Sequence, residues 1–274
     1  MNTKSQILVL GGTGKTGRRV AEQLTELGLP IRVGSRSGTP SFDWEDPKTW
    51  KPALKDIESV YISYHPDLAI PGAVKTVGAF TKLAVENGVK KLVLLSGRGE
   101  KEAQDCEELI MKAGVEWTIL RCSWFNQNFS EGYLLEPIQH GHVALLAGDV
   151  GEPFIDVDDI ADVAVAALTE EGHAGQLYEL TGPRLITFKQ AMAEISKATG
   201  KPIVYEQVTA AEYKAMLTEY EIPEEFIWLV TYLFTEVLDG RNESLTDGVQ
   251  RALGRAPRDF SEYVKKTAAT GVWG

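Results

Sequence analysis

Residues 7–17 of the chain read ILVLGGTGKTG, an apolar run that ends in closely spaced glycines. Gly11, Gly14 and Gly17 form the pattern G-x-x-G-x-x-G, and the following KTGRRVAEQLTELG carries apolar residues three and four places apart, as an amphipathic helix does. A strand joined to a helix in this way needs a tight turn, room for a phosphate against the backbone, and close helix packing. The stretch therefore predicts a dinucleotide-binding turn that opens a βαβ unit.

The residues between these glycines are expected to hold an anion. Backbone N–H groups and the positive end of the helix dipole favour negative charge at Thr13, Lys15 and Thr16, and the Lys15 side chain is expected to contact phosphate or solvent. A P-loop is excluded, because it needs four residues between its first glycine and Gly-Lys-[Ser/Thr], and Gly14 follows Gly11 too closely. The remaining alternative is a tight turn without a ligand.

The end of the second predicted strand indicates which dinucleotide is bound. An NAD-selective protein usually places Asp or Glu there for the ribose hydroxyls, whereas this chain has Ser35, Arg36 and Ser37. A guanidinium can pair with a 2′-phosphate that an acid would repel. The sequence therefore predicts NADP(H), and the alternative is that Arg36 is a solvated surface residue.

Apolar runs of strand length alternate with helical segments through the first half of the chain. Such a rhythm is typical of an α/β protein, a Rossmann-type doubly wound parallel sheet. From about Thr187 the chain reads mainly helical. We expect an NADP-binding Rossmann domain in 1–150, to which 151–183 returns, and a smaller, mainly helical, substrate-binding lobe in 184–274.

Composition narrows the function class. The net charge is -11 with scattered basic residues, which opposes binding to nucleic acid or anionic membranes. No apolar run is long enough to span a membrane and no signal segment opens the sequence, so a soluble, cytoplasmic protein is expected. Cys106 and Cys122 have no metal-ligand spacing and are expected to stay reduced, and no metal site is predicted.

Several stretches together resemble the NmrA-like branch of the atypical short-chain dehydrogenase/reductases (SDRs). They run from GGTGKTG through GVKKLVLLSG, PFIDVDDIADVAVAAL and YELTGP to LGRAPRDFSEYV and cover nearly the whole chain. The stretches SRSG, FDW and SWFNQNFSE look most like the ergot-alkaloid reductases of that family, which reduce an iminium with NADPH. Quinone reductases and benzylic ether reductases are other members.

The resemblance implies a role for residues at the ends of successive strands. Those implied to bind the cofactor, from the diphosphate and 2′-phosphate to the adenine and the nicotinamide ribose, are Gly11, Thr13, Gly14, Lys15, Thr16, Gly17, Ser35, Arg36, Ser37, Asp43, Trp44, Ser63, Ser96 and Gly97. Those implied to border the nicotinamide and the substrate are Trp124, Phe125 and Asn128.

The catalytic group departs from the ordinary SDR pattern. None of the nine tyrosines has a lysine four places later, and the helix after LLSG has Ala103 where some NmrA-like reductases use a lysine, with Lys101 two places earlier. Tyr64 and His65, just past the third strand, are the best-placed candidate proton donors. Their alternative is an ordinary structural or solvated role.

These observations favour an acceptor that needs no Tyr-Lys pair. We expect an NADPH-dependent imine reductase or a reductase of conjugated, quinone-like acceptors, because hydride addition to an iminium yields a neutral amine without a proton donor. The expected substrate is a hydrophobic or cationic small molecule, and the protein is expected to be a monomer or homodimer. The alternative is a non-catalytic NADP(H)-binding redox sensor that regulates a partner protein.

Overall fold

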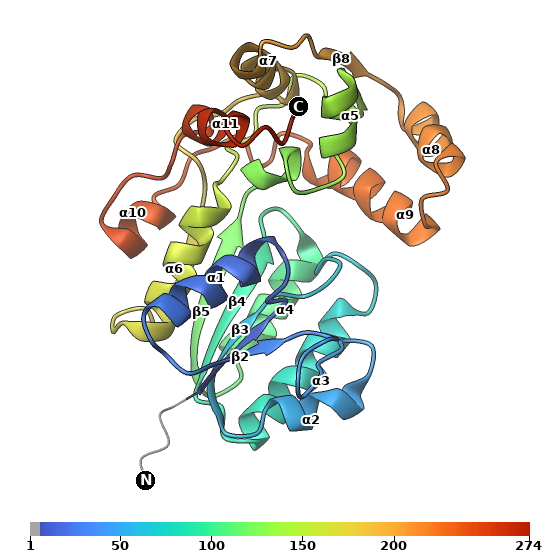
Figure 1. The fold of residues 1–274 in the computed structure, drawn as a ribbon. Coiled ribbons are helices and arrows are strands. Elements are labelled where there is room, and N and C mark those ends of the chain that lie inside the picture. Colours follow the sequence, from blue (N-terminus) through green and yellow to red (C-terminus); the bar gives the residue numbers. More distant parts are fainter. Residues whose placement is uncertain (1–5) are drawn as a thin grey trace. The chain divides into compact units, whose positions relative to one another are not determined.

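The computed structural model describes residues 6–274 and divides the chain into two compact units (Figure 1). The first unit holds the described residues up to Cys122 together with Val157–Leu180 and Asp247–Arg255. The second unit holds Ser123–Asp156, Thr181–Thr246 and Ala256–Gly274.

A six-stranded, fully parallel sheet forms the centre of the first unit. The strand order is β2-β1-β3-β4-β5-β7, so the chain moves outward from β1 in both directions, as in a doubly wound fold. All of these strands come from the apolar runs of the sequence, which is typical of strands buried on both faces. The strands are β1 (Gln6–Leu10), β2 (Ile31–Gly34), β3 (Ile57–Ile62), β4 (Lys91–Gly97), β5 (Glu116–Cys122) and β7 (Gln176–Leu180).

Helices cover the two faces of this sheet. Helix α1 packs against α6 on one face, and α3 packs against α4 on the other, so the predicted Rossmann-type fold is confirmed (Figure 1). Asp158 in the first turn of α6 pairs with Arg19 of α1 at 2.7 Å. The helices of this unit are α1 (Lys15–Glu26), η1 (Pro47–Thr49), α2 (Trp50–Ala53), α3 (Ala73–Glu86), α4 (Lys101–Met111), α6 (Val157–Thr169) and α10 (Gly248–Leu253).

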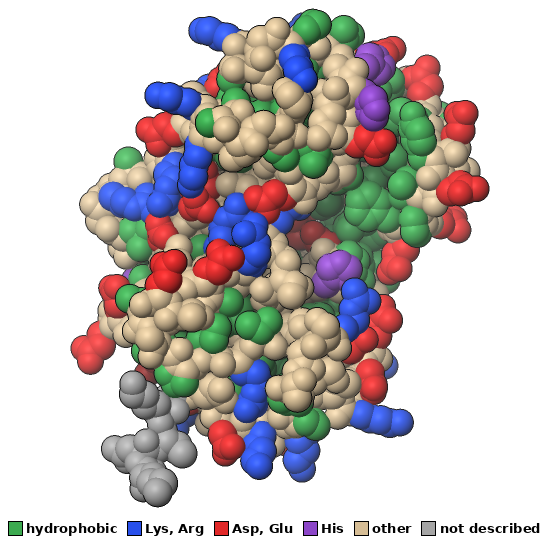
Figure 2. Space-filling model, viewed as in Figure 1, with side chains coloured by type: hydrophobic (Ala, Val, Ile, Leu, Met, Phe, Trp, Pro, Cys, Tyr) green, Lys and Arg blue, Asp and Glu red, His purple; other side chains and the backbone are tan. Residues whose placement is uncertain are grey.

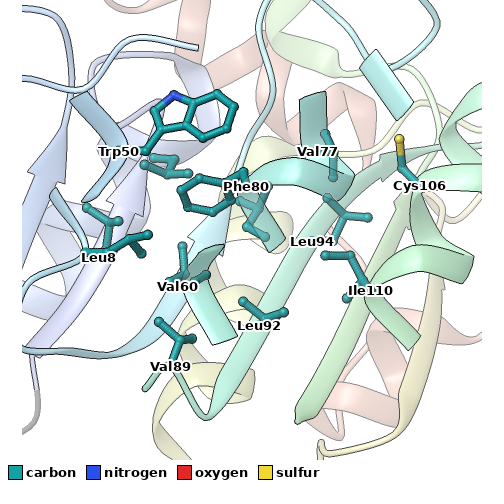
Figure 3. Close-up of a cluster of buried hydrophobic side chains, with 14 of the residues drawn as sticks. Leu8, Trp50, Val60, Val77, Phe80, Val89, Leu92, Leu94, Cys106 and Ile110 are labelled. Atoms are coloured by element: carbon teal, nitrogen blue, oxygen red, sulfur yellow. The ribbon is translucent and has the colours of Figure 1, made fainter. Parts of the chain in front are cut away.

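The core under α3 and α4 follows from strand alternation, which sends every second side chain to one face. Figure 3 shows Leu8, Val60, Leu92 and Leu94 from the strands directed toward Phe80 of α3. Trp50, Val77, Cys106 and Ile110 complete this side of the cluster.

Phe80 is expected to be the most sensitive core position in the first unit. It is fully buried, and its ring lies 5.1 Å from that of Trp44 and 5.6 Å from that of Phe42. Phe80→Ala should lower the free energy of unfolding by about 3–5 kcal/mol, because it removes these contacts and leaves a cavity. Urea unfolding followed by tryptophan fluorescence measures the loss. Leu109→Ala, at a position 36% exposed on α4, should cost much less, and equal losses would contradict this packing.

The second unit is built from helices around an aromatic core. The rings of Phe129, Phe154, Phe188 and Phe260 contact one another, with centroid distances from 5.1 to 5.9 Å. Its two strands, β6 (His142–Leu145) and β8 (Val204–Gln207), pair in parallel. Its helices are η2 (Asn126–Phe129), α5 (Leu135–His140), α7 (Phe188–Thr199), α8 (Ala210–Glu219), α9 (Glu224–Tyr232), the π-helix η3 (Leu233–Val237) and α11 (Phe260–Ala268).

The two units divide the chain differently from the expected boundaries at 150 and 184. Residues 123–156 belong to the second unit, because β6 pairs with β8 and because Phe129 and Phe154 lie in the aromatic core. Residues 247–255 belong to the first unit, because α10 packs on β7. A Cβ atom on Gly248 would lie 2.1 Å from the carbonyl oxygen of Glu179, which shows how close this packing is. Helix α6 and strand β7, within Val157–Leu180, belong to the first unit.

Candidate functional site

The turn between β1 and α1 has the geometry for which glycine is required. Gly11 has φ +64°, a region that other residues rarely adopt, and its carbonyl accepts a hydrogen bond from the Gly14 N–H at 2.8 Å. A Cβ on Gly17 would lie 2.3 Å from the Gly11 carbonyl oxygen. The first glycine therefore makes the turn, and the third lets α1 pack directly against it.

The start of α1 fits the diphosphate of a dinucleotide. The first N–H groups of a helix have no partner within the helix, and no side chain caps them here, because the N-cap residue is Gly14. The first turn of α1 contains no acidic residue. Thr13 and Gly14 are exposed, Lys15 is half-buried and Thr16 is buried. The turn thus presents backbone donors and a positive helix end to an anion.

The end of β2 carries the predicted 2′-phosphate site. The chain folds back here, since the Ser35 carbonyl accepts hydrogen bonds from the N–H groups of Gly38 (3.0 Å) and Phe42 (2.8 Å). The Ser35 and Ser37 hydroxyls lie 3.4 Å apart. Arg36 is exposed, and it forms no ion pair with any residue in 6–274. An exposed arginine that stands between two serines in the sequence, with no acid in 6–274 paired to it, suits a phosphate monoester.

Trp44 and Tyr64 lie together in an aromatic group. The Trp44 ring is 4.9 Å from that of Tyr64, and its Nε1–H donates to the Ser63 carbonyl at 3.2 Å. The Asp43 carbonyl accepts a hydrogen bond from Nε1 of Trp50 at 2.7 Å. The structure therefore brings the residue expected beside the adenine into contact with one of the two expected proton donors. A proton-donor role for Tyr64 stays a prediction.

Ser63 connects the end of β3 to the glycine turn. A Cβ on Gly11 would lie 3.1 Å from the Ser63 Cβ and 3.2 Å from its Oγ, so these two predicted cofactor residues are neighbours. His65 follows two residues later and is exposed, and it makes no hydrogen bond with the part of the chain that the structure describes. Its chemical role also stays a prediction.

The Ser96 side chain points away from the turn, toward α4. Its hydroxyl donates to Glu107 Oε1 at 2.6 Å, and Arg121 Nε donates to the same oxygen at 2.9 Å. Strand alternation explains this direction, because Ser96 shares a face with Leu92 and Leu94. The Ser96 hydroxyl thus hydrogen-bonds to the Arg121–Glu107 ion pair. A contact from Ser96 to the cofactor would have to come from its backbone.

Two acidic residues at this end of the sheet were not predicted. Asp67 follows β3 and Glu100 follows β4, and the two carboxyl groups are hydrogen-bonded to each other. A Cβ on Gly97 would lie 2.1–2.3 Å from the Glu100 carboxyl atoms, so that carboxyl group lies directly over Gly97. Lys101, the lysine considered from the sequence, is instead exposed and paired with Asp105.

The cysteines are buried thiols. Cys106 and Cys122 are both free, as expected. Burial, with acidic neighbours, raises the pKa of the Cys106 thiol to about 12 and raises that of Cys122 as well. Neither thiol is therefore set up as a nucleophile.

The residues expected to border the substrate lie together in the second unit. The Trp124 ring is 4.9 Å from Phe234 and 5.4 Å from Phe188. The Phe125 carbonyl accepts a hydrogen bond from the Asn128 N–H at 3.1 Å. Asn126 was not predicted. It is fully buried, and neither its amide oxygen nor its amide nitrogen finds a hydrogen-bond partner among the residues described.

Aromatic side chains also reach the surface of this unit. Trp228 on α9 is 43% exposed and stacks on Tyr232, with ring centroids 5.4 Å apart and planes 7° apart. Figure 2 shows hydrophobic side chains gathered where α8 and α9 lie. Helix α9 is therefore only partly buried.

A family model described as NAD(P)H-binding matches residues 11–171, which include the glycine turn and most of the sheet. This chain belongs to that family. Agroclavine dehydrogenase of Claviceps fusiformis is 32% identical to it, over 97% of this chain and 98% of the relative. Prestalk A differentiation protein A of Dictyostelium discoideum is also 32% identical, over 97% of this chain and 93% of the relative.

Among solved structures, the Escherichia coli NADPH-dependent quinone oxidoreductase QOR2 in complex with NADPH has the same fold. Its TM-score is 0.79 at 22% identity, covering 95% of this chain and 99% of that one. The NmrA-like resemblance, the NAD(P)H cofactor and the oxidoreductase class are thus confirmed. Within residues 6–274, no helix is both long and apolar enough to cross a bilayer.

Proposed function

We propose that the protein is an NADPH-dependent reductase whose acceptor is an imine, an iminium or a conjugated, quinone-like compound. The observation that carries this choice is the makeup of α4, the helix after β4. It contains no tyrosine, and its first-turn lysine, Lys101, is exposed and paired with Asp105. A simple ketone needs a proton on its oxygen as hydride arrives, and the Tyr-x-x-x-Lys pair that ordinary SDRs use for this is missing.

The residues of the first unit would hold the cofactor. The N–H groups at Gly14 and the start of α1 would bind the diphosphate, and Arg36 would bind the 2′-phosphate. When bound, the reduced nicotinamide supplies a hydride. The chain's part is then mainly positioning, which alone is worth several orders of magnitude in rate when two reacting atoms are held in contact.

The residues that directly follow β5 along the chain would border the acceptor. Trp124 and Phe125 follow β5, the strand next to β4, and ligands of parallel sheets bind at the carboxyl ends of strands. Aromatic rings such as Trp124 favour a flat hydrophobic acceptor and attract a cationic one through their π faces. The π-helix at Leu233–Val237, which carries Phe234, is a kind of element often found at functional sites.

An acceptor panel tests the reductase proposal. NADPH oxidation should be followed by absorbance with cyclic iminium salts, quinones and simple ketones at matched concentration. Turnover is expected with the iminium salts or quinones and not with the ketones. Reduction of ketones at a comparable rate would contradict the proposal.

A redox sensor remains the second candidate, and one relative favours it. Prestalk A differentiation protein A carries a name that states a role in differentiation and no reaction. A sensor would bind NADPH but oxidise it with none of the acceptors in the panel. Binding is therefore to be measured by calorimetry in the same preparation, so that a chain without turnover is separated from one that has lost its cofactor site.

A further inference from the structure

Two acidic side chains meet at the carboxyl ends of β3 and β4. Asp67 lies in the loop after β3, and its Oδ1 accepts a hydrogen bond from the Ala69 N–H at 2.8 Å. Glu100 is the N-cap residue of α4, yet its side chain does not cap the helix. It turns back instead over Gly97, the last residue of β4, and hydrogen-bonds to Asp67.

The surroundings of the Asp67–Glu100 pair favour a proton on Glu100. It is 8% exposed, and no Lys, Arg or His in residues 6–274 forms an ion pair with either carboxyl group. Burial and the neighbouring Asp67 raise the pKa of Glu100 well above its ordinary value. Burial also raises the pKa of Asp67, while the hydrogen bonds from Ala69 and Glu100 favour its charged form. Both pKa values are raised, that of Glu100 more strongly, as expected of two carboxyl groups that share one proton.

The other groups that face Glu100 strengthen this assignment. Glu102 and Glu107 on α4 both act in the same direction as Asp67, since a further negative charge nearby disfavours ionisation. The thiols of Cys106 on α4 and Cys122 on β5 also lie near it, and both stay neutral. Arg98, the nearest arginine along the chain, is instead paired with Glu179 at 2.6 Å.

We propose that the Asp67–Glu100 pair is the proton donor for acceptors that become anionic on reduction, an inference that rests on the proposed reductase function. Its place supports this role, because Gly97 ends β4, where ligands of parallel sheets bind. The pair would act on quinones and neutral imines, whereas a permanently charged iminium needs no proton.

The proposed step balances as follows. The acceptor gains a hydride on one atom and is reduced by two electrons at the expense of the nicotinamide, and the electron pair of its C=N or C=O bond moves to nitrogen or oxygen. The O–H bond of Glu100 breaks, and its proton forms a new N–H or O–H bond on that atom. Glu100 is left as a carboxylate beside Asp67, and water returns a proton before the next turnover.

The first test compares two acceptors in the wild type and two variants. Glu100→Gln should lower kcat for a quinone or neutral imine about a hundredfold, within the range usual for a lost general acid, and change kcat for an N-alkylated iminium by less than about threefold. Glu108→Gln, at an exposed position of the same helix, is the matched control and should change neither. Equal losses on both acceptors, or no loss on either, would overturn the proposal.

The pH profile separates proton donation from a structural role. Wild-type kcat for the neutral acceptor should be highest at low pH and should fall as the pH rises through the raised pKa of Glu100. Asp67→Asn removes the charge that helps raise this pKa, so the fall should move to lower pH. An unchanged profile in Asp67→Asn would overturn the proposal even if Glu100→Gln failed to fold.

An infrared measurement tests the pair without turnover. At neutral pH the wild type should show the carbonyl stretch of a protonated carboxyl group that is missing in Glu100→Gln and present in Glu108→Gln. Absence of that band in the wild type would overturn the proton-sharing pair, whatever the activity. A wild type that shows the band but reduces no acceptor would refute the reductase function, and with it the donor role, while leaving the pair itself established.

Discussion

Gly17→Ala is expected to weaken NADPH binding by about a hundredfold or more. The new Cβ would lie 2.3 Å from the Gly11 carbonyl oxygen and 2.9 Å from the Gly12 nitrogen, both of them backbone atoms that no side-chain rotation can move away. The turn or the start of α1 must therefore shift, and the N–H groups aimed at the diphosphate shift with it. Losing one or two charge-assisted hydrogen bonds, each worth about 1.5–3 kcal/mol, gives an effect of this size.

Gly78→Ala provides the matched control. Gly78 lies within α3, and a Cβ there would meet only the Leu109 side chain, at 3.2 Å. Because alanine is the better helix former by up to about 1 kcal/mol, this change should leave the stability equal or higher. Calorimetric titration with NADPH, with thermal unfolding of each variant, makes the comparison. If Gly17→Ala bound NADPH as tightly as Gly78→Ala, the close approach of α1 to the turn would not matter for binding.

Arg36→Ala is expected to remove the preference for the phosphorylated cofactor. Loss of one guanidinium–phosphate contact should weaken NADPH binding by about ten- to a hundredfold, because such charge-assisted hydrogen bonds contribute about 1.5–3 kcal/mol. NADH has no 2′-phosphate, so its affinity should stay nearly constant. The ratio of the two dissociation constants, measured by titration in one buffer, is therefore the quantity that changes.

Lys82→Ala controls for the loss of a positive charge. Lys82 is exposed on α3 and lies 4.0 Å from Glu86, so its removal changes the net charge as Arg36→Ala does without touching the end of β2. NADPH affinity should fall in Arg36→Ala and not in Lys82→Ala, and added salt should reduce the difference. An Arg36→Ala protein with unchanged selectivity would show that the 2′-phosphate is bound elsewhere.

Local sequence patterns predict the first unit well and the second less well. The inner strands β1, β3 and β4 are mostly apolar runs between turn residues, and most of their residues are buried, which makes the pattern easy to recognise. Strands β6 and β8 were not predicted, because HVAL and VYEQ are four residues long and β8 is mostly exposed. The return of α10 to the sheet was also missed, since it depends on contact with a strand far away in the sequence.

The residues of the candidate site also fall into those that a local pattern predicts and those that depend on contacts between distant segments. The glycine turn is a local feature, so its residues could be named from their spacing alone. The direction of Ser96 was available from the alternation with Leu92 and Leu94, a signal that the resemblance to other reductases overrode. Asp67 and Glu100 follow neighbouring strands but lie far apart in sequence, so their contact appears only when β3 and β4 pair.

A crystal structure with NADPH bound tests the central claim most directly. The diphosphate should lie against the N–H groups at Gly14 and the start of α1, and the 2′-phosphate should lie within hydrogen-bond distance of the Arg36 guanidinium. A diphosphate placed away from the glycine turn, or a 2′-phosphate that points to solvent with Arg36 turned elsewhere, would contradict it.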